Sequence, residues 1–342
     1  MATVSHLQSG ISLRPYNTLG IDVRADALLP VHGVDDLLAV RAEPALNSLP
    51  RLVLGGGSNL LFTRDFDGLV LHMCGAGIAI VGEHSGAVLV RAAAGESWHG
   101  LVTWALAHGL GGLENLSLIP GSVGASPIQN IGAYGSELKD CFHTLTAFDF
   151  ETGDLLQLDR AACEFGYRDS VFKHRLRERA VILDVTFALP KQWRPNLRYT
   201  ELAQEVAARG LAAPGPTDIS DAVIAIRRRK LPDPAVVGNA GSFFKNPVVS
   251  ALLRDALLAR HPQLVSHAQG DGSFKLAAGW LIDQCGWKGR TMGAAGVYEK
   301  QALVLVNRGG ASGAEIVALA QAIQQDVEAR FGVRLEPEPV FV

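Results

Sequence analysis

Apolar residues recur at helical spacing in several stretches of the chain, and these predict its helices. The stretch 34–41 opens with two acidic residues, and 98–106 follows Ser97 as an N-cap and stops before Gly109. From Ser312 to Phe331 one face carries Ile316, Leu319, Ile323, Val327 and Phe331. We expect a long helix there, with this face buried.

Two further segments have the same character. The sequence ISDAVIAIRRRKLPDP predicts a helix capped by Ser220 or Asp221 and ended by Pro232. LAAGWLIDQCG predicts a short helix after it.

Short apolar runs bounded by turn residues predict strands between these helices. They occur at 51–54, 68–73, 180–190 and 301–309, the third closed by Pro190. Two hairpins are expected, at 78–96 with its turn at Ser85 and Gly86, and at 146–158 with its turn at Thr152 and Gly153. Near the end of the chain, Pro337 and Pro339 fit only a sheet edge or a bulge.

Alternating helical and strand patterns over 342 residues favour an α/β protein of two or three compact units. We place boundaries near residues 75 and 232, which gives parts 1–75, 76–232 and 233–342.

Composition narrows the possible classes of protein. A formal net charge of -3 gives no reason to expect nucleic acid as a partner, and the basic run from Arg227 to Lys230 fits a solvated helix face or a small anionic ligand. Cys74, Cys141, Cys163 and Cys285 are far apart, which argues against a zinc site or a disulfide framework. No apolar run approaches a membrane span of about 18 residues, and the first residues do not resemble a secretory signal. We expect a soluble cytoplasmic protein without a bound metal.

Two glycine-rich segments are candidates for an anion-binding site. GGGSN at 55–59 follows a strand, where residues without Cβ atoms allow backbone amides to converge on a phosphate; a plain tight turn is the alternative. The stretch from Gly111 to Gly135 is apolar for a linker and suits an ordered loop around a large cofactor, although a purely structural loop is also possible. Neither GxGxxG nor GxxxxGK[ST] occurs, so a Rossmann site and a Walker loop are disfavoured.

A third segment, VGNAGSFFKNPVV, crowds Ser242, Lys245 and Asn246 beside two phenylalanines at a loop-to-strand junction. Alone it would be an ordinary turn. Together with GGGSN, IPGSVGASPIQNIGAYG, GYRDSVFK (166–173) and LEPE (335–338), it resembles the UDP-N-acetylenolpyruvoylglucosamine reductase family. The resemblance runs from PYNTLGI (15–21) to the end of the chain, with the motifs in the family's order.

The resemblance implies a role for each motif. Ser242 would be the proton donor, Arg168 would stabilise developing negative charge, and Glu338 would assist the protonation. Tyr199, Lys230, Asn246 and Gln301 would line the substrate site, and Tyr199 points to the subgroup that closes a tyrosine-bearing loop over the substrate. Without the resemblance, Arg168 would be taken for a surface ion pair with Asp169, and Glu338 for an exposed acid.

Non-covalent FAD would lie against the two glycine-rich segments. The residues concerned are Gly55, Gly56, Gly57, Ser58, Asn59, Gly121, Gly124, Ala125, Ser126, Ile128, Gln129, Asn130, Ile131, Gly132, Tyr134 and Gly135. The implied fold is an FAD-binding fold of the vanillyl-alcohol oxidase type in two domains, followed by a C-terminal α/β substrate domain. The implied reaction has NADPH reduce the FAD, after which UDP-N-acetylglucosamine enolpyruvate is reduced to UDP-N-acetylmuramate.

One departure from the family pattern stands next to Glu338. The family continues after LEPE with a valine and a basic residue, whereas this chain has Pro339 and Val340. The environment of Glu338 therefore differs from the one that the family pattern implies. An FAD oxidase with tethered flavin and a non-enzymatic nucleotide-sugar-binding or flavin-binding module are the competing hypotheses. We expect a monomer, because no apolar stripe is left without a partner.

Overall fold

The computed structural model describes residues 6–342, and the chain forms two compact units. Among the described residues, the first contains 6–11, 24–57 and 66–229, and the second contains 12–23, 58–65 and 230–342. Each unit is thus built from segments that are distant in sequence. The predicted division at 75 and 232 into three parts stays a prediction.

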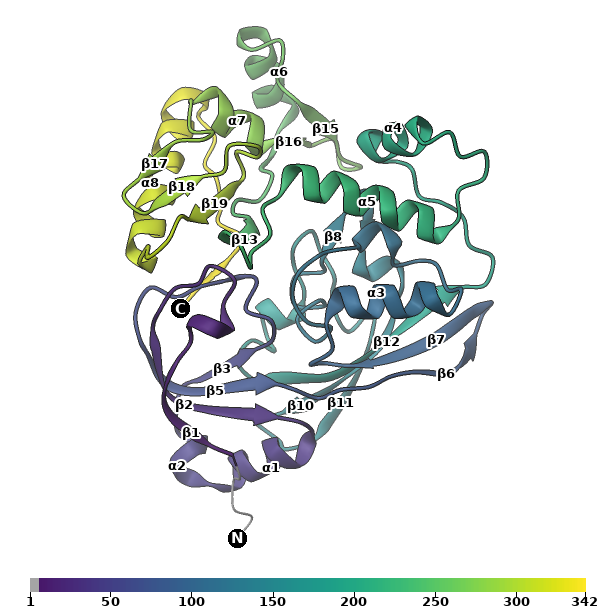
Figure 1. The fold of residues 1–342 in the computed structure, drawn as a ribbon, viewed down its shortest axis with the longest axis vertical. Helices are drawn as coiled ribbons and strands as arrows, with labels where there is room; N and C mark the ends of the chain where they lie inside the picture. The colour runs from purple at the N-terminus through teal and green to yellow at the C-terminus, as the bar shows by residue number, and fades with distance from the viewer. Residues whose placement is uncertain (1–5) are drawn as a thin grey trace. The chain divides into compact units, whose positions relative to one another are not determined.

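A mainly parallel sheet opens the first unit (Figure 1). Its strand order is β1-β2-β5-β3, with β2 and β3 both parallel to β5. The strands are β1 (Gln8–Ser12), β2 (Arg24–Val31), β3 (Arg51–Leu54) and β5 (Phe66–Met73). Helices α1 (Val34–Ala42) and α2 (Pro44–Asn47) pack on it through Leu37, Val40 and Leu46.

An antiparallel sheet forms the larger part of the first unit, in the order β11-β10-β12-β7-β6. Its strands are β6 (Ile78–His84), β7 (Ala87–Ala93), β10 (Phe142–Asp149), β11 (Leu155–Asp159) and β12 (Ala180–Pro190). Helix α3 (Trp98–Ala107) packs on this sheet, and the Trp98 ring meets Phe187 edge-on at 5.8 Å. The hydroxyl of Ser97 accepts a hydrogen bond from Gly100 N at 3.3 Å, which confirms the predicted N-cap.

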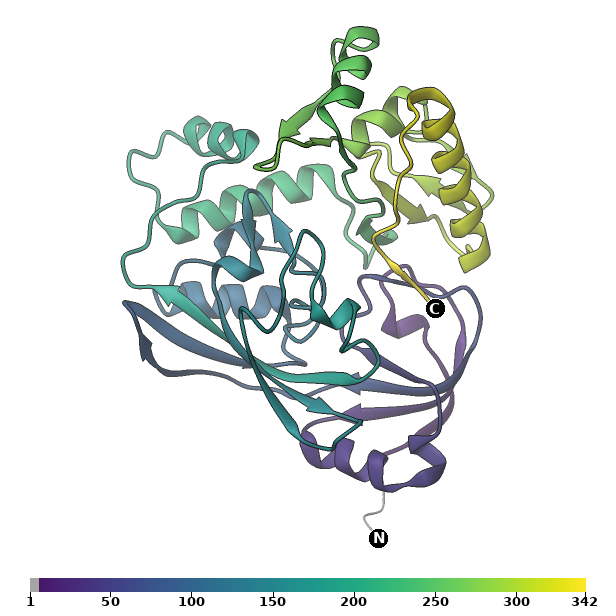
Figure 2. The same ribbon diagram turned by 180° about the vertical axis from the view of Figure 1, so that it is seen from behind.

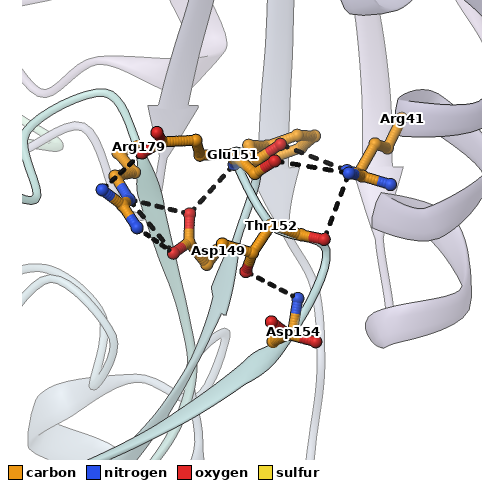
Figure 3. Close-up of polar contacts among 7 residues, drawn as sticks. Arg41, Asp149, Glu151, Thr152, Asp154 and Arg179 are labelled. Atoms are coloured by element: carbon orange, nitrogen blue, oxygen red, sulfur yellow. Dashed lines mark hydrogen bonds and ion pairs between the residues drawn. The ribbon is translucent and has the colours of Figure 1, made fainter.

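Hydrogen bonds and ion pairs of polar side chains hold the β10–β11 turn in place (Figure 3). Asp149 is fully buried and accepts a hydrogen bond from Arg179 Nη2 at 2.6 Å. From α1, Arg41 donates to the carbonyls of Phe150, Glu151 and Thr152 at 3.1–3.3 Å. These bonds join the helix on the parallel sheet to the antiparallel sheet, so the two sheets of this unit are tied by more than apolar contact.

Helices α4 (Thr200–Ala208) and α5 (Pro216–Lys230) complete the first unit (Figure 2). They share an apolar cluster that includes Leu202 and Val223. The prediction that α5 starts at Ser220 or Asp221 was wrong, because Pro216 begins the helix, a position where its missing N–H costs nothing. Ser220 lies inside the helix, where its hydroxyl bonds that of Ser117 at 2.8 Å.

The second unit has an antiparallel sheet in the order β13-β19-β18-β17, with α7 and α8 beside it. The elements are β13 (Gly238–Ser242), α7 (Ala278–Gln284), β17 (Thr291–Met292), β18 (Ala295–Val297), β19 (Val304–Asn307) and α8 (Gly313–Phe331). All five apolar residues predicted for the inner face of α8 are buried, and a capping box of Ser312 and Glu315 starts the helix.

Smaller pieces complete this unit. Strands β14 (Val248–Val249), β15 (Ser266–Ala268) and β16 (Phe274–Leu276) form a three-stranded sheet next to α6 (Ala251–Arg260). β4 (Leu60–Leu61) pairs in parallel with β20 (Val340–Phe341), as expected for an edge position after Pro337 and Pro339. The turn η1 (Arg14–Tyr16) belongs to the same unit.

Candidate active site

The candidate residues fall in both units. Arg168, Tyr199 and the stretch from Gly111 to Gly135, here called the cofactor loop, belong to the first unit. Ser242, Asn246, Gln301 and Glu338 belong to the second, which begins again at Lys230. Each unit therefore offers its own set of groups.

The cofactor loop is ordered although little of it is regular structure. It contains one turn of 3-10 helix, η2 (Glu114–Leu116), and ends in the short hairpin of β8 (Gly132–Ala133) and β9 (Ser136–Glu137). Asn130 and Tyr134 have left-handed backbones, with φ of 45° and 48°. Such conformations cost roughly 1–3 kcal/mol each and persist where the surroundings impose them.

The glycines of GGGSN lie directly against this loop. A Cβ on Gly55 would overlap Ser122 Oγ, and one on Gly56 would lie 2.9 Å from Gly121 Cα. The backbones of Gly56 and Gly121 can approach this closely only because neither residue has a side chain. The buried Ser122 hydroxyl has no hydrogen-bond partner within residues 6–342. Close-packed amides with an unused hydroxyl fit a phosphate-bearing cofactor such as FAD.

Other loop residues are occupied by the protein itself. Ser126 Oγ donates to Val123 O at 2.6 Å, and Ile128 and Ile131 pack against the core of the antiparallel sheet. Asn130 Nδ2 donates to Gly166 O at 2.9 Å. These residues shape the loop, and a direct contact between their side chains and a flavin stays a prediction.

Arg168 stands in a strained turn beside the cofactor loop. Its φ is 55°, and its Nη2 donates to Gly132 O at 3.0 Å. Lys173 Nζ donates to Arg168 O at 2.8 Å, and Ser170 Oγ donates to Ile128 O at 2.7 Å. Asp169 pairs with His174 at 2.8 Å, whereas a surface pair with Arg168 was the alternative reading of the motif. The turn fixes the guanidinium next to the loop that would hold the cofactor.

Tyr199 is 44% exposed and precedes α4. Its ring meets Tyr134 edge-on with 5.3 Å between centroids. Burial raises the pKa of Tyr134 to about 12, with nearby Arg227 acting in the opposite direction. Tyr134 is the more buried of the two rings, so the exposed phenol of Tyr199 is the one that a ligand can reach.

In the second unit, Ser242 is the last residue of β13, and the chain that follows runs beside the LEPE segment. Glu338 N donates to Phe243 O at 2.8 Å, and Lys245 N donates to Glu336 O at 2.9 Å. Asn59 Nδ2 donates to Glu338 O at 3.3 Å. Two motifs almost a hundred residues apart are thus adjacent, and the side chains of Ser242 and Glu338 are carried by neighbouring backbones.

Asn246 and Gln301 both approach the start of α7. Asn246 Oδ1 accepts a hydrogen bond from Ala278 N at 3.0 Å. A Cβ on Gly279 would lie 3.1 Å from Gln301 Oε1. The structure therefore brings these two predicted substrate residues to one place within the second unit.

The comparisons with known proteins agree over nearly the whole chain. A family model for an FAD binding domain matches residues 25–159, and one for the UDP-N-acetylenolpyruvoylglucosamine reductase C-terminal domain matches 233–342. UDP-N-acetylenolpyruvoylglucosamine reductase of Paraburkholderia phymatum is 60% identical over 330 residues, covering 96% of this chain and 95% of the relative. That of Azoarcus sp. is 60% identical, covering 96% of each chain.

The chain belongs to the UDP-N-acetylenolpyruvoylglucosamine reductase family. The crystal structure of the Thermus caldophilus reductase covers 98% of this chain and 99% of its own, with a TM-score of 0.69 at 24% identity, and supports the fold. The resemblance predicted from the motifs is confirmed, as are the FAD-binding fold with a C-terminal α/β domain and FAD as the cofactor.

The structure adds two residues of this family member that the motifs did not single out. Arg227, in the basic run, is partly exposed, but its Nε is buried without a hydrogen-bond partner within residues 6–342. Burial lowers the pKa of Arg227, and Tyr134 opposes that shift. Asn115, in the cofactor loop, is 1% exposed. No sequence signal distinguished Asn115, which stands between Glu114 and Leu116.

Proposed function

We propose that this chain reduces UDP-N-acetylglucosamine enolpyruvate to UDP-N-acetylmuramate with electrons from NADPH, a step in the synthesis of peptidoglycan precursors. The observation that carries the proposal is the pairing of the Ser242 strand with the Glu338 segment, in a chain whose Arg168 is held beside the cofactor loop. We also propose that it acts as a monomer in the cytoplasm. Within residues 6–342, no helix is long and apolar enough to cross a membrane.

FAD, when bound, supplies a hydride to the methylene carbon of the enolpyruvyl group. The residues that would hold it are the glycines at 55–57, of which Gly55 and Gly56 lie against the cofactor loop, and the glycines at 121–135. The Ser122 hydroxyl, which has no hydrogen-bond partner within residues 6–342, lies beside them. No bulky side chain separates the two segments, so backbone amides of both can reach a diphosphate.

Arg168 would bind the substrate carboxylate and the negative charge that develops beside it. A guanidinium presents a planar, forked set of hydrogen-bond donors that matches the geometry of a carboxylate. The strained turn and the bonds from Lys173 and to Gly132 hold it in place before the substrate arrives. Because the guanidinium is already in place, little rearrangement of the protein is needed when negative charge develops on the substrate.

Ser242 would give its proton to the carbon next to that carboxylate. A serine hydroxyl is a weak acid, so it can serve only a strongly basic carbanion and needs a neighbour that shares or replaces the proton. Glu338 is suited to this because its backbone is hydrogen-bonded to the residue after Ser242. Tyr199, Lys230, Asn246 and Gln301 would bind the UDP-sugar.

The experiment follows the two half-reactions by stopped-flow absorbance of the flavin. With Ser242→Ala, NADPH should bleach the flavin at the wild-type rate. Reoxidation by the enolpyruvyl substrate should slow by about 10²–10⁴-fold, the usual contribution of a positioned general acid. Ser266→Ala, on β15, is the matched control and should leave both rates unchanged. Equal slowing of both half-reactions by Ser242→Ala would make Ser242 a binding residue.

A further inference from the structure

Tyr199 is preceded by a segment that has no helix or strand of its own. Residues 193–199, here called the tyrosine segment, follow β12 and lead into α4. Such a segment has no regular ladder of backbone hydrogen bonds to fix its conformation. The position of Tyr199 therefore depends on the hydrogen bonds that the segment makes to its neighbours. Its bonds go to the cofactor loop.

Asn115 makes the central connection. Its Nδ2 donates to Tyr134 O at 2.8 Å and to Asn196 O at 2.9 Å, so one buried amide joins the cofactor loop to the tyrosine segment. Both partners are carbonyl oxygens, which only the NH₂ end of the amide can satisfy. Asn115 Oδ1 has no hydrogen-bond partner within the described part of the chain. The two donated bonds therefore set the orientation of this side chain.

A second connection lies closer to Tyr199. Asn196 Nδ2 donates to Gly135 O at 2.9 Å and to Ser136 Oγ at 2.8 Å. Arg198 Nη2 donates to the same carbonyl of Gly135 at 3.1 Å. Gly135 has a φ of 82°, and a Cβ there would lie 3.6 Å from Tyr199 N. The end of the cofactor loop is thus in contact with the backbone that carries the phenol.

A third connection lies at the first residue of the tyrosine segment, Trp193. Trp193 Nε1 donates to Glu114 Oε1 at 2.8 Å, and Glu114 Oε2 accepts from Gly112 N at 2.5 Å. Glu114 is 3% exposed although it is an acid, and Trp193 packs near the α4–α5 cluster. Adjacent loop residues, Glu114 and Asn115, therefore hold both the beginning and the middle of the tyrosine segment.

We propose that Asn115 is a positioning residue for substrate binding. Asn115 does not touch the sugar nucleotide. It bonds the tyrosine segment to the cofactor loop, so the conformation of this loop determines where Tyr199 lies. A loop arranged around its cofactor holds Tyr199 in the binding position, and the energy of sugar-nucleotide binding is in turn linked to the order of that loop. The inference rests on the proposed substrate contact of Tyr199.

The test is a double-mutant cycle on the holoenzyme at saturating FAD. Affinity for the product UDP-N-acetylmuramate is measured from the change in the visible flavin spectrum, without turnover. Asn196→Ala should weaken binding about five- to tenfold, as expected for the loss of the two hydrogen bonds that Asn196 Nδ2 donates to Gly135 and Ser136. Asn115→Asp keeps the shape of the side chain but replaces its NH₂ group, which donates to two carbonyls, with an oxygen that can only accept. Because both bonds are lost, binding should weaken by at least about tenfold.

In a Tyr199→Ala background, both substitutions should change the affinity less than about twofold, because the group that they position is gone. Asn47→Asp, the same change at an exposed site on α2, is the matched control and should have no effect. Should Asn115→Asp fail to fold, Asn115→Ala takes its place, because it removes the same two donated bonds without turning an acceptor toward the carbonyls. Asn196→Ala tests the second connection only, since Asn115 bonds the backbone carbonyl of Asn196.

Full effects of Asn115→Asp and Asn196→Ala in the Tyr199→Ala background would overturn the positioning role and leave the proposed reaction intact. Unchanged product affinity of Tyr199→Ala itself would remove Tyr199 from the substrate site, and the positioning role would fall with it. Stopped-flow reduction by NADPH and reoxidation by substrate report separately on whether the proposed reaction stands.

Discussion

Helix α8 and the cofactor loop are both well packed, but they owe their order to different forces. Along α8, large apolar side chains recur on one face and are buried, while the ends are fixed by a capping box and by Gly332 in the left-handed conformation. In the cofactor loop, apolar residues such as Val123 are also buried, but the irregular backbone is fixed by side chains that bond its carbonyls, such as Asn115 to Tyr134 and Ser126 to Val123.

The difference teaches where a protein can place a ligand. A helix held by its apolar face has satisfied its backbone groups internally, so its surface has few donors to offer. A loop held by polar side chains can leave a polar group to a ligand, as at Ser122, whose hydroxyl has no hydrogen-bond partner within the described part of the chain. The first arrangement supports stability and the second supports binding, and substitutions can separate the two.

The largest effect on folding is expected for Ile323→Ala in the buried face of α8. Removing these methyl and methylene groups should lower the free energy of unfolding by about 2–5 kcal/mol through lost burial and a residual cavity. Urea unfolding measured by circular dichroism checks this. Gln325→Ala, on the exposed side, should stay within about 0.5 kcal/mol of wild type. Equal losses for the two variants would contradict the buried-face explanation.

Gly56→Ala tests whether the close packing of glycines against the cofactor loop serves FAD binding. The added Cβ would lie 2.9 Å from Gly121 Cα, so one of two backbones must move. We expect FAD affinity to fall at least about tenfold, equivalent to roughly 1.4 kcal/mol, with a smaller change in folding than for Ile323→Ala. Titration of the apoprotein with FAD, followed by flavin fluorescence, measures it. Gly270→Ala, where a Cβ meets nothing within 4 Å, is the control, and wild-type affinity of Gly56→Ala would refute the close-packing argument.

The smallest effect is expected at the β10–β11 turn, which like the loop is held by polar contacts. The hydrogen bond from Arg179 lowers the pKa of Asp149, so the folded state favours the ionised carboxylate more than the unfolded chain does. This stabilisation is complete above the unfolded pKa of about 3.9 and is lost as the pH falls through the lower folded value. Arg179 is partly exposed, so the gain is moderated by solvent.

Asp149→Asn should therefore be less stable than wild type at pH 7, and the difference should shrink below about pH 4. Urea unfolding at several pH values gives both curves, with the exposed Asp154→Asn as the control. A difference that stays constant down to pH 3 would mean that the ion pair is not its source.

Regular elements with clear periodicity could be predicted from the sequence. The α8 face, the two hairpin turns and the Ser97 cap follow from local rules that depend on few distant contacts. The start of α5 was mispredicted because Ser220 resembles a cap, whereas its hydroxyl serves a tertiary bond to Ser117. That partner is 103 residues away, beyond the reach of any local pattern.

The candidate site could be predicted as motifs but not as geometry. Nothing in GNAGSFFKNP or LEPE shows that Glu338 N bonds Phe243 O, because the pairing of distant segments is a property of the folded chain. Asn115 was missed for the same reason. Its role comes from two carbonyls, one 19 and one 81 residues away in sequence.

The pairing of β4 with β20 has a consequence for how the chain is made. Asn59 and Thr63 bond residues that follow 279 positions later, and residues 12–23 and 58–65 belong to the unit that the last third of the chain completes. At synthesis rates of about 5–20 residues per second, these early segments wait roughly 15–55 s for their partners. The second unit can close only late in translation, so newly made chains expose its unpaired edges to chaperones before the active site can exist.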